Sequence, residues 1–468
     1  MQLDKETEMG LLRKLAFLAC ISFIARTNAT CTVEFKDVII LILSQSDGYH
    51  AAHAVQMKNS IQDQADTLDK EPPQVVLSHE LNIQGSWTII PMLTYLSDQF
   101  PHGKWFFFCL ENTVIRLQKL LNVFEKFCSS KNIWIGHILY DHQPTIIHHF
   151  SDNKKFKYPN LESGIGMTIT LLNSLAKEIR DGKEPEQDFS IDAPYEFAKF
   201  ILTNKAAKLI HMHRLCVVSA ENCATYPRFF HSCSSHIAPK DVYFAVKTCA
   251  KYHVSRISVV KKTWAKYKLN IGYFSDAADK NLPEAYVVPN TTTGHCAKTY
   301  AILQEASKIL KKQNFKWLVI VDDDTILSVS RLLDLLTCYN PESSLAIGER
   351  YGYRIWKRGY QYLTGGAGIV LSAPLVHELV SSDSCECPFA TIPDDMYLFG
   401  HCLQHHGQIV HFSMFHQAQP GDYPNAYLTQ EPISFHRFWN FDPEAIYNDW
   451  FAAADQHLPL AHLSHSEL

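Results

Sequence analysis

The sequence predicts an α/β protein with two similar domains in tandem. Apolar runs typical of buried strands alternate with segments of helical periodicity in both halves, which favours mainly parallel sheets covered by helices. Three motifs also recur in the same order, each about 200 residues further along the chain. A chain of 468 residues, 46% of them hydrophobic, can bury two large cores.

The recurring motifs mark strand-like runs and their ends. The first opens apolar runs at residues 37–40 and 241–244, and the second begins with Lys-Trp and closes on Thr at residues 104–113 and 316–325. Their common order indicates a duplicated architecture.

The third motif contains glycines and is followed by an acid. It pairs residues 164–166 with 366–368, and Asp192 and Asp394 each follow the second glycine by 26 residues. Between the copies, a stretch rich in Cys, Ser and Pro interrupts the pattern.

These boundaries divide the chain into four predicted segments. We expect a signal peptide over 1–29, an N-terminal domain over 30–205, a linker over 206–239 and a C-terminal domain over 240–468.

The N-terminal segment is typical of a secretory signal. Arg13 and Lys14 precede an apolar stretch at residues 15–25, and cleavage is predicted after Ala29. The stretch is shorter than the roughly 20 residues that span a bilayer, so we expect no stable membrane span. A retained signal anchor is the open alternative.

The last four residues, 465–468, resemble a retrieval signal of the endoplasmic reticulum, which a retrieval receptor would bind. Glycosylation sequons at Asn28 and Asn290 are compatible with the same compartment. We therefore expect the protein in the lumen of the endoplasmic reticulum.

The cysteine content agrees with an oxidising lumen. Thirteen cysteines are present, and removal of Cys20 with the signal leaves twelve, an even number suited to disulfides. A zinc site at Cys385 and Cys387 is the weaker alternative, because no second pair stands at metal spacing.

The charge balance argues against a nucleic-acid partner. The 43 basic and 48 acidic residues give a formal charge of −5, which lacks the positive surplus that phosphate backbones demand.

Three acids follow the strand-like run at residues 317–321. Asp322, Asp323 and Asp324 come together at the carboxyl end of a strand, where open α/β sheets bind ligands. In an extended segment Asp322 and Asp324 point the same way, while Asp323 points oppositely. Because adjacent carboxylates repel one another, we expect Mn²⁺ or Mg²⁺ and a nucleotide diphosphate at the outer pair.

Helix capping is the alternative explanation of these acids. Asp324 or Thr325 would then cap a helix over 326–338. Capping accounts for one acid and leaves the other two unexplained.

Small residues and further acids follow in the same half. Gly366, Ala367 and Gly368 would allow close approach of the backbone to a ligand or a tight structural turn. Asp394 and Asp395 follow a proline, so they suit a general base or an ordinary helix start.

A late histidine is the last candidate. His436 follows Ser-Phe and could complete a metal shell as a neutral imidazole.

Together, Asp-Asp-Asp, Gly-Gly-Ala-Gly, Pro-Asp-Asp-Met and Ser-Phe-His resemble the fringe-type β1,3-glycosyltransferases over about residues 240–452. The resemblance implies a GT-A fold that uses a UDP-sugar and Mn²⁺ and inverts the anomeric carbon by direct displacement. It implies that Asp322, Asp324 and His436 hold the metal and that Asp322 and Asp323 also contribute to the donor site.

The same resemblance assigns the remaining roles. It implies that Asp395 is the catalytic base, supported by Asp394. Asp276, Lys298 and the residues 366–368 would contact the donor.

The duplicated architecture and the retrieval-like tail make the chain most similar to family members that transfer glucose from UDP-glucose to O-linked fucose on thrombospondin type 1 repeats. Composition and spacing do not distinguish the donor sugars. The alternatives are a fringe-like O-fucose β1,3-N-acetylglucosaminyltransferase and a non-catalytic luminal protein that binds glycans.

The N-terminal copy lacks the predicted chemistry. Leu110, Glu111 and Asn112 replace the three acids, and Ala193 stands opposite Asp395. We expect a catalytically silent domain, which would either recognise the protein acceptor or support the active half.

Overall fold

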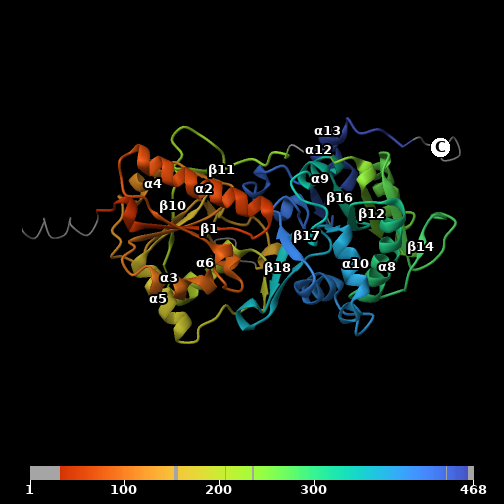
Figure 1. Cartoon of the computed structure of the whole chain (residues 1–468), viewed down its shortest axis with the longest axis horizontal. Coiled ribbons are helices and arrows are strands. Elements are labelled where there is room, and N and C mark those ends of the chain that lie inside the picture. The colour runs from red at the N-terminus through yellow and green to blue at the C-terminus, as the bar shows by residue number, and fades with distance from the viewer. Residues whose placement is uncertain (1–31, 152–155, 206, 234–236, 439, 462–468) are drawn as a thin grey trace, which may run out of the picture.

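The protein has two α/β domains that lie side by side along the long axis of the molecule (Figure 1). The computed structural model describes residues 32–151, 156–205, 207–233, 237–438 and 440–461. Each domain is built on a mixed sheet with helices on both faces, which confirms the predicted fold class of two tandem α/β units.

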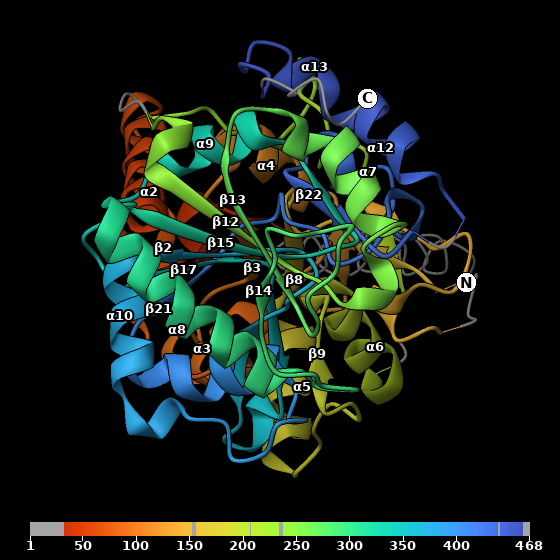
Figure 2. The same cartoon turned by 90° about the vertical axis from the view of Figure 1, so that its right-hand side faces the viewer.

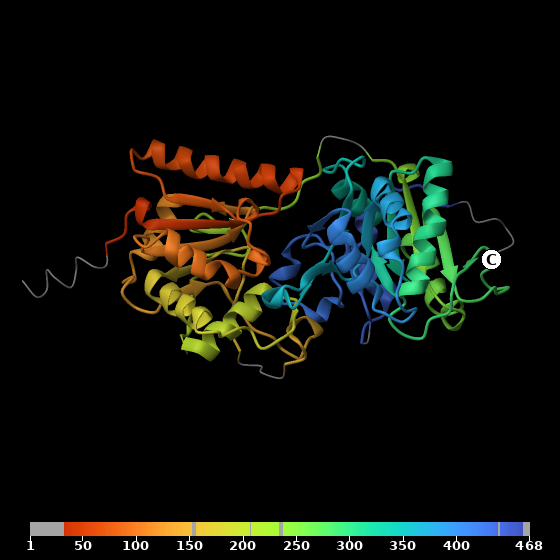
Figure 3. The same cartoon turned by 60° about the horizontal axis from the view of Figure 1, so that its bottom comes forward.

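The N-terminal sheet has six strands in the order β10-β5-β8-β3-β1-β2. The strands are β1 (Val38–Leu43), β2 (Gln74–Leu77), β3 (Trp105–Leu110), β5 (Trp134–Gly136), β8 (Ile165–Thr168) and β10 (Leu209–His211). Its helices are α2 (Gly48–Thr67), α3 (Leu93–Gln99), α4 (Leu117–Phe124), α5 (Ile169–Arg180) and α6 (Ala193–Lys205). Figure 3 shows α2 running over one face of this sheet.

The C-terminal sheet has seven strands in the order β14-β13-β12-β15-β20-β17-β21. They are β12 (Val242–Lys247), β13 (Asn270–Ser275), β14 (Tyr286–Val287), β15 (Trp317–Asp322), β17 (Leu345–Gly348), β20 (Ile369–Ser372) and β21 (Gln408–His411). The helices are α7 (Arg256–Lys262), α8 (Cys296–Gln313), α9 (Val329–Leu336), α10 (Ala373–Ser381), α11 (Asp394–Met396), α12 (Pro443–Trp450) and α13 (Ala452–Asp455). Figure 2 places this domain in front of the N-terminal one.

The central strands are apolar throughout because both faces of each sheet are covered. In β15, Trp317, Val319 and Val321 pack with α7, α9 and α12, while Leu318 and Ile320 pack with α8 and α10 on the opposite face. Strand β1 divides its side chains between two clusters in the same way. The cores thus hold the carboxyl ends of the strands in fixed positions.

Register confirms that the two sheets are equivalent and corrects one detail. Strand β3 pairs with β8 from Trp105 and Thr168, as β15 pairs with β20 from Trp317 and Ser372. Gly164 therefore matches Gly368 and not Gly366, and these two glycines share a φ near +90°. The sequence alignment was two residues out of step because the motif is rich in small residues.

The predicted linker, 206–239, is too long at its N-terminal end. Strand β10 completes the N-terminal sheet beside β5, and β11 (Thr225–Pro227) pairs with β4 (Thr113–Ile115) of the same domain. Such pairing depends on distant strands, so local composition gave no sign of it.

Contacts between the domains are extensive. Strand β9 (Phe189–Ser190) of the first half pairs with β18 (Arg350–Tyr353), which in turn pairs with β19 (Tyr360–Leu363). The side chain of Gln45 also accepts from the backbone N–H of His411 at 2.8 Å and donates to its carbonyl at 2.9 Å. A strand of one domain therefore extends a sheet of the other.

Disulfides account for most of the described cysteines. Four bridges join Cys216–Cys223, Cys233–Cys338, Cys296–Cys387 and Cys385–Cys402, and Cys128 is also disulfide-bonded, whereas Cys109 and Cys249 are free. The zinc alternative at Cys385 and Cys387 is wrong, because both sulfurs are consumed by bridges to different partners.

Some predictions concern residues outside the described part of the chain. These are the signal at 1–29, the sequon at Asn28 and the tail at 465–468. Within the described residues, every helix is too short or too polar to cross a bilayer.

Candidate active site

The site lies at the carboxyl edge of the C-terminal sheet, where β12 and β15 end side by side. Their register pairs Lys247 with Asp322, so a cation and an anion face each other at the strand ends. Lys247 Nζ lies 3.1 Å from Asp322 Oδ1 and 2.8 Å from Asp394 Oδ2. One buried ammonium thus joins two of the acids predicted from the sequence.

A short ladder brings His436 to the acids. Strand β16 (Thr325–Leu327) pairs antiparallel with β22 (Ser434–His436), which sets His436 opposite Thr325. The expected helix over 326–338 therefore begins later, at Val329. Its N-cap is Ser328, whose side chain accepts from the N–H of Arg331, so capping by Asp324 or Thr325 is wrong.

Asp322, Asp324 and His436 form a cluster suited to a metal ion. One ligand atom from each lies within 4.8 Å of the others, and His436 Nε2 is 3.0 Å from Asp324 Oδ1. His436 Nδ1 donates to the carbonyl of Gln417 at 3.1 Å, so Nε2 faces the acids. Against the effect of burial, the nearby acids raise the pKa of His436, and Nε2 would give up its proton to bind a metal. Two carboxylates and a neutral imidazole fit Mn²⁺ or Mg²⁺.

Asp324 is held in its ionised form. Burial raises the pKa of its carboxyl, but the hydrogen bond and charge of His436, with the charge of Arg256, outweigh burial and lower the pKa to about 2. Arg256 Nη1 lies 2.8 Å from Asp324 Oδ2. An ionised carboxylate is the form that coordinates a metal.

Asp323 and Asp324 lie in a turn and not in an extended segment, and both carboxylates contact Arg256 Nη1, so the expected alternation does not describe them. The buried carboxylate of Asp323 accepts from Thr248 Oγ1 at 2.7 Å and from Arg256 Nη1 at 2.8 Å. Donor binding by Asp323 stays a prediction, and its visible contacts anchor the loop and Arg256.

The glycine motif packs directly against the metal-binding cluster. A Cβ on Gly366 would lie 2.4 Å from two atoms of the His436 ring, so this position has no room for a side chain. Ala367 donates its N–H to Gln417 Oε1 at 3.0 Å, and Gly368 has a φ of +89°. The motif thereby lets His436 approach the strand ends.

Asp394 and Asp395 have opposite electrostatic environments. Burial raises the pKa of Asp394, but Lys247 outweighs it and holds the pKa below its usual value. Burial and the nearby charge of Asp394 raise the pKa of Asp395 to about 7. A carboxylate with a pKa near neutrality is suited to accept a proton.

The two remaining predicted donor contacts lie at the same edge. Asp276 follows β13 and accepts from the N–H of Ala250 at 2.8 Å. Lys298, on α8, is buried and donates to the carbonyl of Thr248, and burial lowers its pKa. Their roles toward a donor stay predictions.

Three residues of this site are not predicted from the sequence. Lys247 and Arg256 supply its counter-charges, and Gln417 orients His436 and the glycine motif. Lys247 could have been found from the sequence, because it ends the apolar strand-like run at residues 242–247, just as Asp322 ends the run at residues 317–322. Arg256 and Gln417 carry no comparable local signal.

Comparison with known proteins agrees with this geometry. A Fringe-like family model matches residues 237–457, which is the C-terminal domain. Nearly the whole chain is similar to a β-1,3-glucosyltransferase of Homo sapiens, with 41% identity across 93% of this chain and 88% of that protein. The chain belongs to the fringe-like β1,3-glucosyltransferase family. It is therefore a glycosyltransferase, as the resemblance implied.

The extent of the similarity differs among the relatives. A β-1,3-glucosyltransferase of Mus musculus is 40% identical across 91% of this chain and 88% of that protein. The β-1,3-N-acetylglucosaminyltransferase lunatic fringe of Mus musculus is 27% identical over 157 residues, which is 30% of this chain and 41% of that protein. The two glucosyltransferases are thus much more similar to this chain than this fringe is.

The fringe-like domain carries the full acid cluster, and the N-terminal domain does not. In the equivalent ladder, β11 pairs Pro227 with Thr113, so Pro227 occupies the position of His436. Leu110 and Asn112 occupy the positions of Asp322 and Asp324. The N-terminal edge therefore lacks all three side chains of the candidate metal site.

Proposed function

We propose that this glycosyltransferase transfers glucose from UDP-glucose to O3 of O-linked fucose on thrombospondin type 1 repeats, with inversion at the anomeric carbon. The single observation that carries the proposal is the juxtaposition of the Asp322, Asp324 and His436 cluster with a carboxylate, Asp395, whose pKa lies near 7. The names of the human and mouse relatives support the choice of glucose and of the β1,3 linkage.

The cluster would hold the donor through a divalent cation. Asp322, Asp324 and His436 are the residues that would bind Mn²⁺ or Mg²⁺, which would neutralise the diphosphate as it leaves. Lys247 and Arg256 balance the acids and fix their orientation. Gly366 and Gly368 keep the backbone close to this cluster.

Asp395 would act on the acceptor hydroxyl. Its carboxylate takes the proton of the fucose O3 hydroxyl while that oxygen bonds to the anomeric carbon of glucose. The bond from this carbon to the diphosphate oxygen breaks on the opposite face, and the configuration inverts. Asp394, tied to Lys247 and Thr299, would position its neighbour.

A donor and acceptor screen tests the proposal. The full chain is incubated with Mn²⁺, several UDP-sugars and either fucosylated thrombospondin type 1 repeats or fucosylated epidermal-growth-factor-like repeats. We expect transfer from UDP-glucose to the thrombospondin type repeat, and none by Asp395→Asn. Preferential transfer of N-acetylglucosamine to the growth-factor-like repeat would replace this function with the fringe activity.

The screen also separates an enzyme from a glycan-binding protein. A non-catalytic protein would neither transfer sugar nor hydrolyse UDP-sugars, whatever the donor. The complete acid cluster supports turnover over binding alone.

We further propose that the protein works in the lumen of the endoplasmic reticulum, where a retrieval receptor binds its tail. The described disulfides support an oxidising compartment. Removal of residues 465–468 should shift the protein from cells to medium; unchanged retention would contradict the proposed retrieval.

A further inference from the structure

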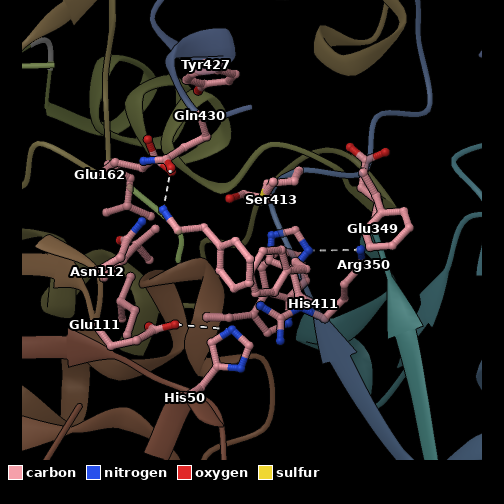
Figure 4. A pocket seen from close by; sticks show the side chains of 18 of the residues that line it. His50, Glu111, Asn112, Glu162, Glu349, Arg350, His411, Ser413, Tyr427 and Gln430 are labelled. Carbon is pink, nitrogen blue, oxygen red and sulfur yellow. Dashed lines mark hydrogen bonds and ion pairs between the residues drawn. The ribbon is translucent and has the colours of Figure 1, made fainter. Parts of the chain in front are cut away.

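A cavity lies between the domains, at the carboxyl edge of the N-terminal sheet. Its volume is about 360 Å³, which falls within the ~300–1,000 Å³ typical of small-molecule sites. Leu110, Glu111 and Asn112 line it from the N-terminal side, and Arg350 and His411 from the C-terminal domain (Figure 4). It thus occupies the edge that is equivalent to the catalytic one.

Aromatic side chains form much of the cavity wall. Tyr49, Phe230 and Phe412 are in mutual contact, with ring centroids 5.4 to 6.2 Å apart. Trp87 adds a further aromatic ring, and the Arg350 guanidinium lies 4.5 Å from its centroid. These rings offer flat apolar surfaces to a ligand.

Several residues that line the cavity also carry buried polar atoms without partners. Across the described residues, the buried donors Arg350 Nε, Trp87 Nε1 and Asn160 Nδ2 make no hydrogen bond, nor do the acceptors Asn112 Oδ1 and Glu162 Oε2. Buried polar atoms are normally hydrogen-bonded, so their concentration around one cavity points to a ligand that both donates and accepts.

The charge of the cavity disfavours a nucleotide. Four carboxylates, from Glu111, Glu162, Asp192 and Glu349, line it with two arginines, Arg228 and Arg350. The side chains of the metal-binding cluster are replaced. Burial raises the pKa of Glu162 to about 7 and that of Glu349 to about 8, which further reduces the charge of the lining. The lining therefore has no surplus of cations to hold a diphosphate, whereas a neutral ligand needs none.

We propose that this cavity binds a neutral saccharide of one or a few pyranose units. Sugar hydroxyls donate and accept at once, which matches the mixed set of unpartnered atoms, and the C–H face of a pyranose packs on aromatic rings. The site is separate from the metal-binding cluster. It requires neither the donor nor the acceptor proposed above.

Binding to the full chain tests the site directly. Saturation-transfer NMR uses glucose, fucose, mannose, N-acetylglucosamine and the glucosyl-β1,3-fucose disaccharide, each with and without UDP and Mn²⁺. At least one saccharide should bind, and saturating UDP with Mn²⁺ should not displace it. Failure of all five to bind, or displacement by UDP, would overturn the proposal.

Variants then locate the binding. Ser413 is exposed and lines the cavity, so Ser413→Trp should block it and reduce saccharide affinity at least tenfold, while Ser413→Ala retains binding. Asn112→Leu, which removes one acceptor, should also weaken binding if Ser413→Trp fails to fold. Asp324→Ala serves as the matched control at the catalytic edge and should keep saccharide affinity.

The variants can also contradict the assignment. Unchanged saccharide affinity in folded Ser413→Trp would place the saccharide elsewhere. If that variant does not fold, unchanged affinity in Asn112→Leu would have the same meaning. Loss of affinity in Asp324→Ala would assign the bound sugar to the catalytic site.

Discussion

The two sheet edges share one backbone arrangement and differ in chemistry. In the catalytic half, Thr325 Oγ1 donates to the carbonyl of Gly366 at 2.9 Å, and in the other half Thr113 Oγ1 donates to the carbonyl of Glu162 at 2.9 Å. Ser434 and Thr225 likewise donate to the carbonyls of Ala367 and Ser163. The scaffold that shapes an active site can therefore persist without the reacting groups.

The difference is concentrated at the strand ends. The register that sets Lys247 against Asp322 sets Leu43 against Leu110 in the N-terminal sheet, so an apolar pair replaces an ion pair. Without its cation and acids, that edge cannot hold a metal diphosphate. The C-terminal domain instead closes the space beside this edge, which forms the interdomain cavity.

The largest effect is expected at the proposed base. Asp395→Asn nearly preserves volume but cannot accept a proton, so kcat should fall by about 10²–10⁴. Ala193→Ser, at the start of α6 in the N-terminal half, should leave kcat unchanged. Glycosyltransfer assays with UDP binding as a folding control measure both, and full activity in Asp395→Asn would remove the assignment.

Loss of the bridging cation should destabilise the catalytic edge. Lys247→Met leaves Asp322 and Asp394 without their buried partner, and breaking such a pair costs about 3–5 kcal/mol. Denaturant unfolding monitors the change. An unchanged midpoint together with normal activity would show that this ion pair is dispensable.

The glycine motif allows a matched comparison of neighbours. Gly366→Ala should cost about 1–3 kcal/mol and weaken metal binding, because the new methyl group meets the His436 ring. Gly365→Ala meets no atom within 4 Å and should be close to neutral. Thermal unfolding and Mn²⁺ titration of both variants decide the point; equal behaviour would contradict the packing argument.

A smaller effect concerns pH. Asp395 must be ionised to accept a proton, and its pKa is raised to about 7 by burial and by Asp394. The value of kcat/KM should therefore rise with pH, reach half its maximum near pH 7 and level off above it, falling about tenfold per unit well below 7. Asp394→Asn removes the neighbouring charge and should move the rise of kcat/KM to lower pH. A shift to higher pH would argue against the effect of Asp394 on the pKa of Asp395.

Local sequence pattern predicted the two domains and the acids at a strand end, because buried strands and clustered carboxylates are evident in any single segment. It misplaced the start of the helix before Val329, since Thr325 to Leu327 become a strand only by pairing with β22 more than 100 residues later. Gln417 could not be predicted for the same reason, because its role depends on a contact with His436 that only the fold creates.

Metal titration of the full chain in the presence of UDP tests the central contrast most directly. Calorimetry should show one Mn²⁺ per chain, with binding abolished or strongly weakened by Asp324→Ala and unchanged by Asn112→Ala. Binding that survives Asp324→Ala, or that depends on Asn112, would contradict the assignment of the metal to the C-terminal edge.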